Sequence, residues 1–98
     1  MIATLPTQEQ VDLIARDLSP DVVRIRFNVG RDWSEHPALY FRVILSDEAS
    51  RFDRLPHTTE LVREKLSHEL GLAVLDHLPY FRFRSQSEQA KMHDTAWD

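Results

Sequence analysis

Three segments of the chain alternate between apolar and polar side chains with a period of two residues. Apolar residues occupy every second position of residues 23–29 and 39–45, and the alternation returns in residues 80–84. This period is typical of β-strands that bury one face and leave the other in solvent. The three segments therefore predict a small sheet with one apolar face and one polar face.

Helix-capping signals flank these segments. Residues 7–10 read TQEQ, a capping box in which the threonine hydroxyl and the second glutamine satisfy each other's backbone amides. Apolar residues then follow at helical spacing until Pro20, which ends the helix because the residue before a proline disfavours the α conformation. A second capping box, SQSE at residues 85–88, opens a short final helix that runs to about residue 92.

The middle of the chain predicts a loop and a longer helix. The polar segment around Phe52 and Leu55 predicts a loop that these two apolar residues hold in place. Thr58 or Thr59 then caps a helix with an apolar stripe, and Gly71 ends or bends that helix near its last turn.

The resulting order α-β-β-α-β-α predicts an α+β fold, a two-layer open-faced sandwich with a three-stranded mixed sheet. The polar connection at residues 30–37 joins the first two strands as a hairpin. We expect one domain over residues 1–98, with residues 93–98 as a flexible or partner-docking tail. The residues expected at the centre of the core are Phe27, Phe41, Leu66, Leu70, Phe81 and Phe83.

Composition narrows the class of protein. The 98 residues include no cysteine, which excludes a disulfide framework, a cysteine-ligated zinc site and thiol catalysis, and favours a cytoplasmic protein. Residues 1–6 lack the charged start and apolar stretch of a signal peptide, and no apolar run approaches the roughly 20 residues that cross a bilayer. We therefore expect neither secretion nor membrane insertion. The formal net charge of -4 argues against a polycationic nucleic-acid binder.

The polar face of the predicted sheet is rich in arginine. Five of the 12 basic residues fall on it: Arg24, Arg26, Arg42, Arg82 and Arg84. Tyr40 and Tyr80 alternate onto the same face. Guanidinium groups bind phosphate or carboxylate in bidentate fashion and also stack, so this face suits an anionic partner. Two alternatives remain open: the arginines are solvated or paired with nearby carboxylates, or the final helix folds back over them.

Other candidate sites are weaker. Asp32, Glu35 and His36 place carboxylates beside an imidazole in the hairpin connection, but turn chemistry explains such residues and we expect no catalytic group there. Trp33 and Trp97 are candidate contact residues, since tryptophan is enriched at interface hot spots. The five histidines form no H-x-x-x-H pair, and two glycines cannot build a phosphate-cradling loop. We expect no metal, no cofactor and no enzymatic activity.

Several motifs together resemble a family of small uncharacterised bacterial proteins. The stretches are DVVRIR at residues 21–26, the Asp32-Trp33 pair, YFRVILSD at residues 40–47 and YFRFRSQSE at residues 80–88. Members of that family are encoded beside small helical proteins with a HEPN domain, in an arrangement like a toxin–antitoxin pair. The resemblance implies a protein partner and no catalytic residues. The usual partner of HEPN proteins is a minimal nucleotidyltransferase, but its Gly-Ser turn and Asp-x-Asp motif are missing here, so a degenerate, inactive relative is the most that this likeness allows.

The order α-β-β-α-β is also similar to the type II KH arrangement of ribosome-binding factor A-like proteins. The G-x-x-G loop of ordinary KH domains is absent. The sequence thus supports two hypotheses. The first is a non-enzymatic cytoplasmic protein-binding module, antitoxin-like or regulatory, whose partner is a small helical HEPN-type protein. The alternative is a KH-like module that binds RNA through the arginine and tyrosine face. Self-association is compatible with either.

Overall fold

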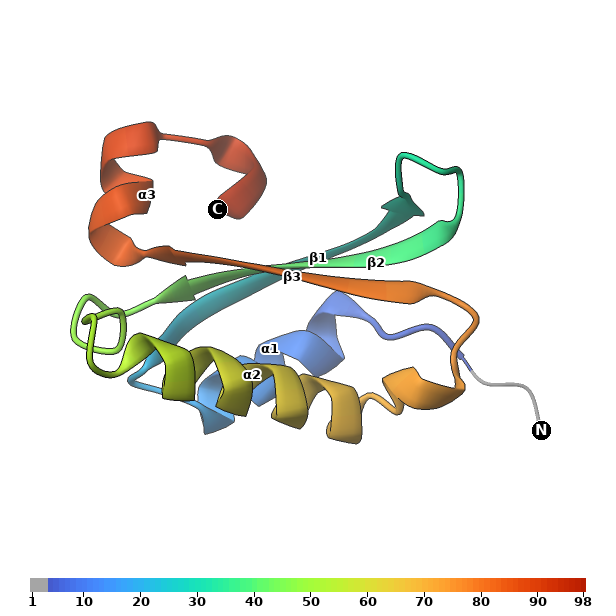
Figure 1. The fold of residues 1–98 in the computed structure, drawn as a ribbon, viewed down its shortest axis with the longest axis horizontal. Helices are drawn as coiled ribbons and strands as arrows, with labels where there is room; N and C mark the ends of the chain where they lie inside the picture. The colour runs from blue at the N-terminus through green and yellow to red at the C-terminus, as the bar shows by residue number, and fades with distance from the viewer. Residues whose placement is uncertain (1–3) are drawn as a thin grey trace.

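The computed structural model describes residues 4–98, and its helices and strands follow the predicted order (Figure 1). The elements are α1 (Gln8–Asp17), β1 (Val22–Arg31), β2 (Pro37–Leu45), α2 (Leu55–Glu69), β3 (Leu78–Ser85) and α3 (Gln86–Met92), with short 3-10 helices η1 (Leu72–Val74) and η2 (Thr95–Trp97). The expectation of an α+β fold with a three-stranded sheet is confirmed.

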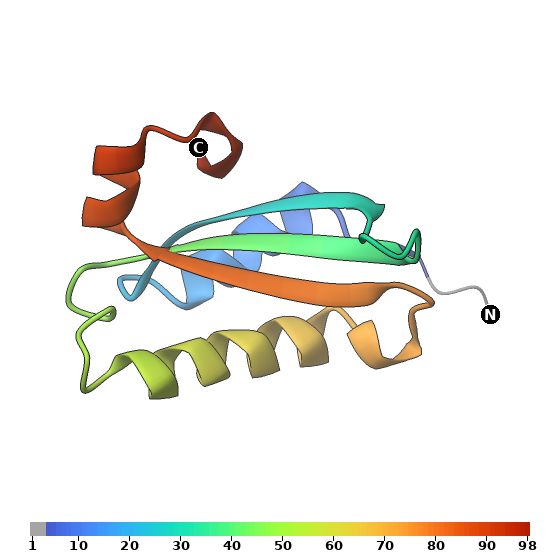
Figure 2. The same ribbon diagram turned by 45° about the horizontal axis from the view of Figure 1, so that its top comes forward.

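The sheet is mixed, with β2 in the middle (Figure 2). The hairpin pairs β1 with β2 antiparallel, while the crossover through α2 brings β3 beside β2 in parallel. The register aligns Phe27, Phe41 and Phe81 across the three strands, with ring centroids 5.2 Å apart in each neighbouring pair. This aromatic ladder lies on the face that the helices cover.

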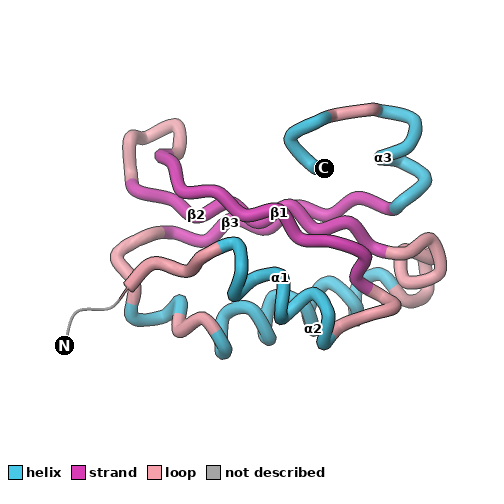
Figure 3. Tube along the Cα trace, turned by 180° about the vertical axis from the view of Figure 1, so that it is seen from behind, coloured by secondary structure: helices cyan, strands magenta, loops and turns pink. Residues whose placement is uncertain are grey.

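Helices α1 and α2 lie under one face of the sheet, and α3 with η2 lies on the other side (Figures 1 and 3). Phe41 and Leu66 are fully buried, as expected. Phe27, Phe81, Phe83 and Leu70, also expected at the centre, are only partly buried against the core. The three phenylalanines lie on the edge strands β1 and β3, so solvent reaches their side chains from one flank, and Leu70 lies at the C-terminal end of α2.

Both capping boxes form as predicted. The Thr7 hydroxyl accepts from the Gln10 amide, and the Ser85 hydroxyl accepts from the Glu88 amide. The expected start of the long helix at Thr58 or Thr59 is wrong, because α2 begins at Leu55 with a proline in its first turn, where a missing N–H costs nothing. Gly71 ends α2, with the left-handed φ of 61° that glycine adopts without strain.

The expected loop anchors Phe52 and Leu55 are both exposed, Leu55 as the first residue of α2, and the inward position that the alternation of residues 23–29 predicts for Val23 is also wrong. Phe52 is 97% exposed, and the buried residue of its loop is Ala49, which Ser46 turns inward by accepting its backbone amide at 3.1 Å. Val23 points away from the core, because a register irregularity between Val22 and Arg24 brings Val22 inward instead. Between residues 4 and 98, no helix combines the length and apolar character that crossing a membrane requires.

Candidate binding face

The sheet face opposite α1 and α2, here called the open face, carries its side chains in three rows defined by the strand register. The end row is Arg24, Ile44 and Arg84; the middle row is Arg26, Arg42 and Arg82; the tyrosine row is Asn28, Tyr40 and Tyr80. Each row takes one residue from each strand. All five predicted arginines and both predicted tyrosines therefore share this face, but their environments differ from row to row.

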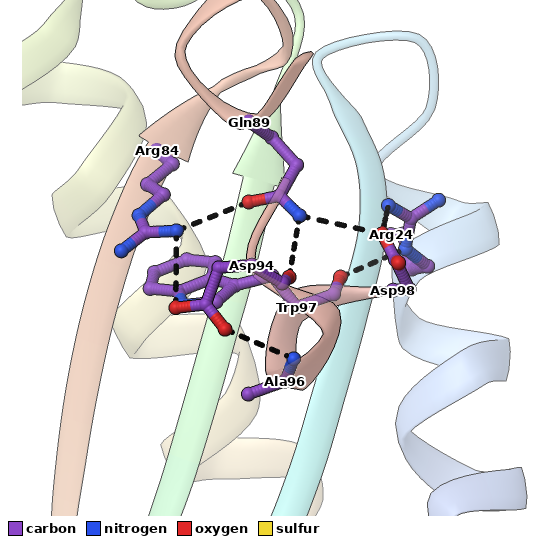
Figure 4. Close-up of polar contacts among 7 residues, drawn as sticks. All are labelled: Arg24, Arg84, Gln89, Asp94, Ala96, Trp97 and Asp98. Carbon is purple, nitrogen blue, oxygen red and sulfur yellow. Dashed lines mark hydrogen bonds and ion pairs between the residues drawn. The ribbon is translucent and has the colours of Figure 1, made fainter. Parts of the chain in front are cut away.

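The end row is covered by the segment that follows β3. Helix α3 leads away from the sheet, and η2 returns over it, so that the Trp97 ring lies beside Arg84 (Figure 4). The Arg84 Cζ atom is 4.2 Å from the centroid of that ring. Ile44 is 1% exposed although it alternates with Arg42 on the open face. The apolar side chain of Ile44 in the end row is therefore buried under η2.

Hydrogen bonds and ion pairs fasten this cover to both edge strands (Figure 4). The Arg84 guanidinium donates to Gln89 Oε1 at 3.1 Å and lies 3.5 Å from an Asp94 carboxylate oxygen. On the opposite edge, Arg24 Nε donates to the Trp97 carbonyl at 3.1 Å. Arg24 and Arg84, both predicted to bind a partner, therefore hold the protein's own C-terminal segment.

Trp97 is placed differently from the expected tail residue. Its side chain is buried, with 2% of the residue exposed, and it belongs to the packing of the end row. Gln89 is the residue that sequence reasoning missed: it is 7% exposed and donates to the Asp94 carbonyl at 2.7 Å while accepting from Arg84. A glutamine in a polar helix gives no signal of burial, because the burial depends on where the chain returns.

The middle row has no such cover. Arg26 and Arg82 are exposed and Arg42 is half-buried. Arg42 donates to the Asn28 side-chain oxygen, and its guanidinium lies 6.0 Å from the centre of the Tyr40 ring. Among the residues that the structure describes, no carboxylate lies within ion-pair distance of these three arginines. The middle row therefore concentrates positive charge that the folded protein does not neutralise by direct pairing.

The two tyrosines pack on each other and hold the hairpin connection. Their rings stack with centroids 5.5 Å apart. The Tyr40 hydroxyl donates to the Arg31 carbonyl at 2.8 Å, and the Tyr80 hydroxyl donates to Asp32 Oδ2 at 2.8 Å. A Cβ atom on Gly30 would lie 3.3 Å from a carbon at the edge of the Tyr40 ring, so a larger residue at this position would crowd that ring.

Asp32 organises the turn. One of its oxygens accepts from the Ser34 amide, the Ser34 hydroxyl and the His36 amide, while the other accepts from Tyr80. The hydrogen bonds from Ser34, and next from Tyr80, lower the pKa of Asp32 to about 2. The same contact raises the pKa of the Tyr80 hydroxyl. Asp32 therefore stabilises the turn as a fully engaged carboxylate, in agreement with the expectation of turn chemistry.

Trp33, at the tip of this turn, is 95% exposed. Its neighbours fix the backbone of the turn, so the ring is presented to solvent from a defined position. The open face thus has a line of positive charge in the middle row, a carboxylate at Asp32 on one side of it, and the carboxylates of Asp94 and Asp98 on the other.

A pocket adjoins the open face at Arg84. It has a volume of about 410 Å³ and lies where the start of α2, the end of β3 and the start of α3 meet. Its lining residues are Leu45, Ser50, Leu55, Pro56, Thr59, Phe83, Arg84, Ser85 and Glu88. Sequence reasoning missed this pocket because it placed the first turn of α2 in a loop. Within residues 4–98, no group of three or more acidic, histidine or cysteine side chains is arranged to hold a metal ion.

In comparisons with known proteins, no family model matches the chain, and neither a curated protein nor a solved structure matches it.

Proposed function

We propose that this protein is a non-enzymatic, cytoplasmic protein-binding module whose middle row binds an acidic surface of a partner protein. The resemblance of its motifs to proteins encoded beside HEPN-domain proteins makes a small helical protein of that type the first partner to test. In such a pair this chain is the antitoxin-like or regulatory member.

The observation that carries the proposal is the contrast between two rows of arginines on one sheet face. Arg24 and Arg84 each have a carboxylate within 4 Å, whereas the middle row has none among the described residues. An arginine keeps its charge at all physiological pH values and presents a planar fork of donors that matches a carboxylate. Three such groups in register, one per strand, are an anion-binding surface that the protein leaves open.

Carboxylates on both flanks of the middle row limit the positive surface to a short length along the strands: Asp32 lies on one flank and Asp94 on the other. A continuous phosphate backbone running along the strands would pass both carboxylates and be repelled, whereas a short acidic patch of a protein can contact the middle row alone. RNA readers of this shape also stack bases on exposed aromatic rings. Here the Tyr40 and Tyr80 rings stack on each other, so each ring has one face occupied by the other.

Trp33 extends the proposed interface beyond the arginines. It is 95% exposed on a turn that is linked to the open face by the hydrogen bond between Tyr80 and Asp32. An exposed aromatic ring provides apolar contact area that arginines alone lack, and tryptophan is frequent at interface hot spots.

Co-expression with the helical product of the neighbouring gene tests the proposal. We expect the wild-type protein to capture this partner, and Arg26→Glu to abolish capture because it reverses the charge of the middle row. The matched control is Arg16→Glu, on α1 and on the opposite side of the sheet, which should capture as well as wild type. If the wild type captures no partner, and instead binds single-stranded RNA with an affinity that falls steeply with salt, the protein hypothesis is replaced by the RNA one.

A further inference from the structure

The two edge strands differ in whether a side chain occupies their outer backbone hydrogen-bonding groups. On β1, the Gln8 side chain donates to the Ile25 carbonyl at 2.7 Å and accepts from the Phe27 amide at 2.8 Å. Gln8 therefore occupies the hydrogen-bonding positions that another strand would use. Strand β3 is the last strand on the other side of the sheet (Figure 2). Among the described residues, no side chain forms a hydrogen bond with the backbone of Phe81 or Phe83.

The contacts of Gln8 also show which backbone groups of β3 point outward. The backbone N–H and C=O groups of Ile25 and Phe27 point away from β2. Because these groups alternate in direction along a strand, the backbone groups of Arg26 and its partner Arg42 point toward each other and form a hydrogen-bonded pair. On β2, the backbone N–H and C=O groups of Phe41 then point toward β3. In a parallel pair these groups bond to the neighbours of the register partner and not to the partner itself. The backbone groups of Phe81, the partner of Phe41, therefore point outward from the edge of the sheet.

The open part of this edge is short and has defined ends. By the same alternation, the backbone groups that face outward from the β3 edge are those of Pro79, Phe81, Phe83 and Ser85. Proline has no N–H to offer. The Ser85 amide donates to Glu88 Oε1 at 3.1 Å, which fits its outward direction. The donors left for an incoming strand are thus the amides of Phe81 and Phe83.

The side chains around these two amides define what an incoming strand would meet. On the open face, exposed Arg82 lies between them and belongs to the middle row. On the helix face, Phe81 and Phe83 are partly buried, and the Arg63 guanidinium lies 5.4 Å from the centre of the Phe83 ring. Phe83 also lines the pocket of about 410 Å³ that continues toward Leu55 and Pro56. That volume is within the range of about 300–1,000 Å³ typical of ligand pockets.

We propose that the β3 edge binds an extended segment of a protein partner in which acidic and apolar side chains alternate. The segment adds a fourth strand through the amides of Phe81 and Phe83. Its acidic side chains lie on the open face beside Arg82, and one apolar side chain enters the pocket beside Phe83. This mode of recognition takes affinity from main-chain hydrogen bonds and specificity from pockets for alternate side chains. The inference rests on the proposed function, since it uses one end of the middle row.

Charge favours this occupant over a second copy of the chain. Antiparallel pairing of two β3 edges through Phe81 and Phe83 would place Arg82 of one copy directly opposite the same arginine of the other. Like charges directly opposite each other destabilise a strand pair, whereas opposite charges stabilise it. An alternating acidic strand relieves the unpaired charge at Arg82, and a second copy adds to it.

The test uses a short synthetic peptide in which glutamate and leucine alternate, titrated into the full chain and followed by fluorescence anisotropy. We expect binding, and at least a tenfold weaker affinity for Arg82→Gln, while Arg16→Gln binds as wild type does. An N-methyl group on every second amide removes the main-chain donors on one side of the peptide. Because a strand presents alternate amides to its neighbour, methylation of one set should abolish binding and methylation of the other should preserve it.

Equal binding of both methylated peptides would overturn strand addition, and so would a chain that dimerises and ignores the peptide. The Leu55→Trp variant, which fills the pocket mouth, should weaken the peptide severalfold, and unchanged affinity would remove the pocket from the inference. Failure here is distinguishable from failure of the proposed function: the neighbouring-gene partner would then still depend on Arg26, which lies on the opposite edge of the middle row.

Discussion

The Arg84 guanidinium lies over the indole ring of Trp97, with its Cζ atom 4.2 Å from the ring centroid, and this contact divides the open face into two parts. On one side of it the chain's own C-terminal segment covers the end row, whose Ile44 is almost completely buried. On the other side the C-terminal segment does not cover the middle row, whose Arg26 and Arg82 are exposed to solvent. The same residue type therefore serves folding in one row and is available for binding in the next.

Trp97→Ala should lower the free energy of unfolding by about 2–3 kcal/mol, because it removes the burial of a large aromatic ring and uncovers Ile44. The segment can detach without leaving a cavity in the main core, so the loss should stay below that of a central aromatic residue. Urea melts measure the change. Trp33→Ala is the matched control and should shift stability by less than about 0.5 kcal/mol, since its ring is almost fully exposed. Equal losses in the two variants would show that Trp97 is not docked.

Arg84→Gln and Arg82→Gln should lower the free energy of unfolding by different amounts in the same urea melts. The Arg84 side chain is 16% exposed and contacts Asp94, Gln89 and the Trp97 ring, so its loss should destabilise the protein by about 1–2 kcal/mol. Asp94 remains 43% exposed, which keeps the effect below that of a fully buried pair. Arg82→Gln should change stability by less than about 1 kcal/mol. A large loss for Arg82→Gln would return the middle row to a structural role.

Gln8→Ala should open the β1 edge. The variant leaves the Phe27 amide and the Ile25 carbonyl without their partner, which should cost about 1–2 kcal/mol. Hydrogen exchange is the sharper measurement, because the Phe27 amide should lose protection while amides on β2 keep theirs. Gln86→Ala, at the exposed start of α3, serves as the control and should leave the Phe27 amide unchanged. Retained protection at Phe27 in Gln8→Ala would contradict an edge closed by this side chain.

The link between Asp32 and Tyr80 predicts a pH dependence. The pKa of Asp32 is lowered from 3.8 to about 2, so its contribution to stability is complete above the unfolded value and is lost as the pH falls toward 2. Carboxyl NMR titration should give a midpoint near 2 in the wild type. Tyr80→Phe should raise that midpoint, though not fully to 3.8, because the Ser34 contacts remain. Tyr40→Phe should leave it unchanged, since that hydroxyl donates to the Arg31 carbonyl. An identical midpoint in wild type and Tyr80→Phe would exclude the hydrogen bond.

Local patterns were sufficient for the fold and insufficient for the division of the open face. Period-two alternation placed Tyr40 and Arg42 on the polar side of a strand, and the capping residues Thr7 and Ser85 fixed two helix starts. These features depend on residues close in sequence. The sequence could not show that Ile44 is buried on the polar face, because that burial depends on a segment whose chain direction is set beyond α3.

The errors have the same origin. Phe52 is apolar and was expected to anchor its loop, but the turn at Ser46 brings Ala49 inward first. Val23 fits a regular alternation, yet a single irregularity in register turns it outward. In both cases one backbone detail outweighs the hydrophobicity of the side chain. The pocket beside Phe83 was missed for a related reason, since a misplaced helix start hid one of its walls.

The dissociation constant of the complex with the proposed partner, a small helical HEPN-type protein, decides whether the middle row is a binding surface, and calorimetry on charge-reversal variants measures it. Arg26→Glu and Arg82→Glu should each weaken the complex at least tenfold, about 1.4 kcal/mol, while the fold and its melting midpoint stay close to those of the wild type. Arg16→Glu, on the helix side of the sheet, should bind as wild type does. Wild-type affinity in both middle-row variants would contradict the assignment of the open face to partner binding.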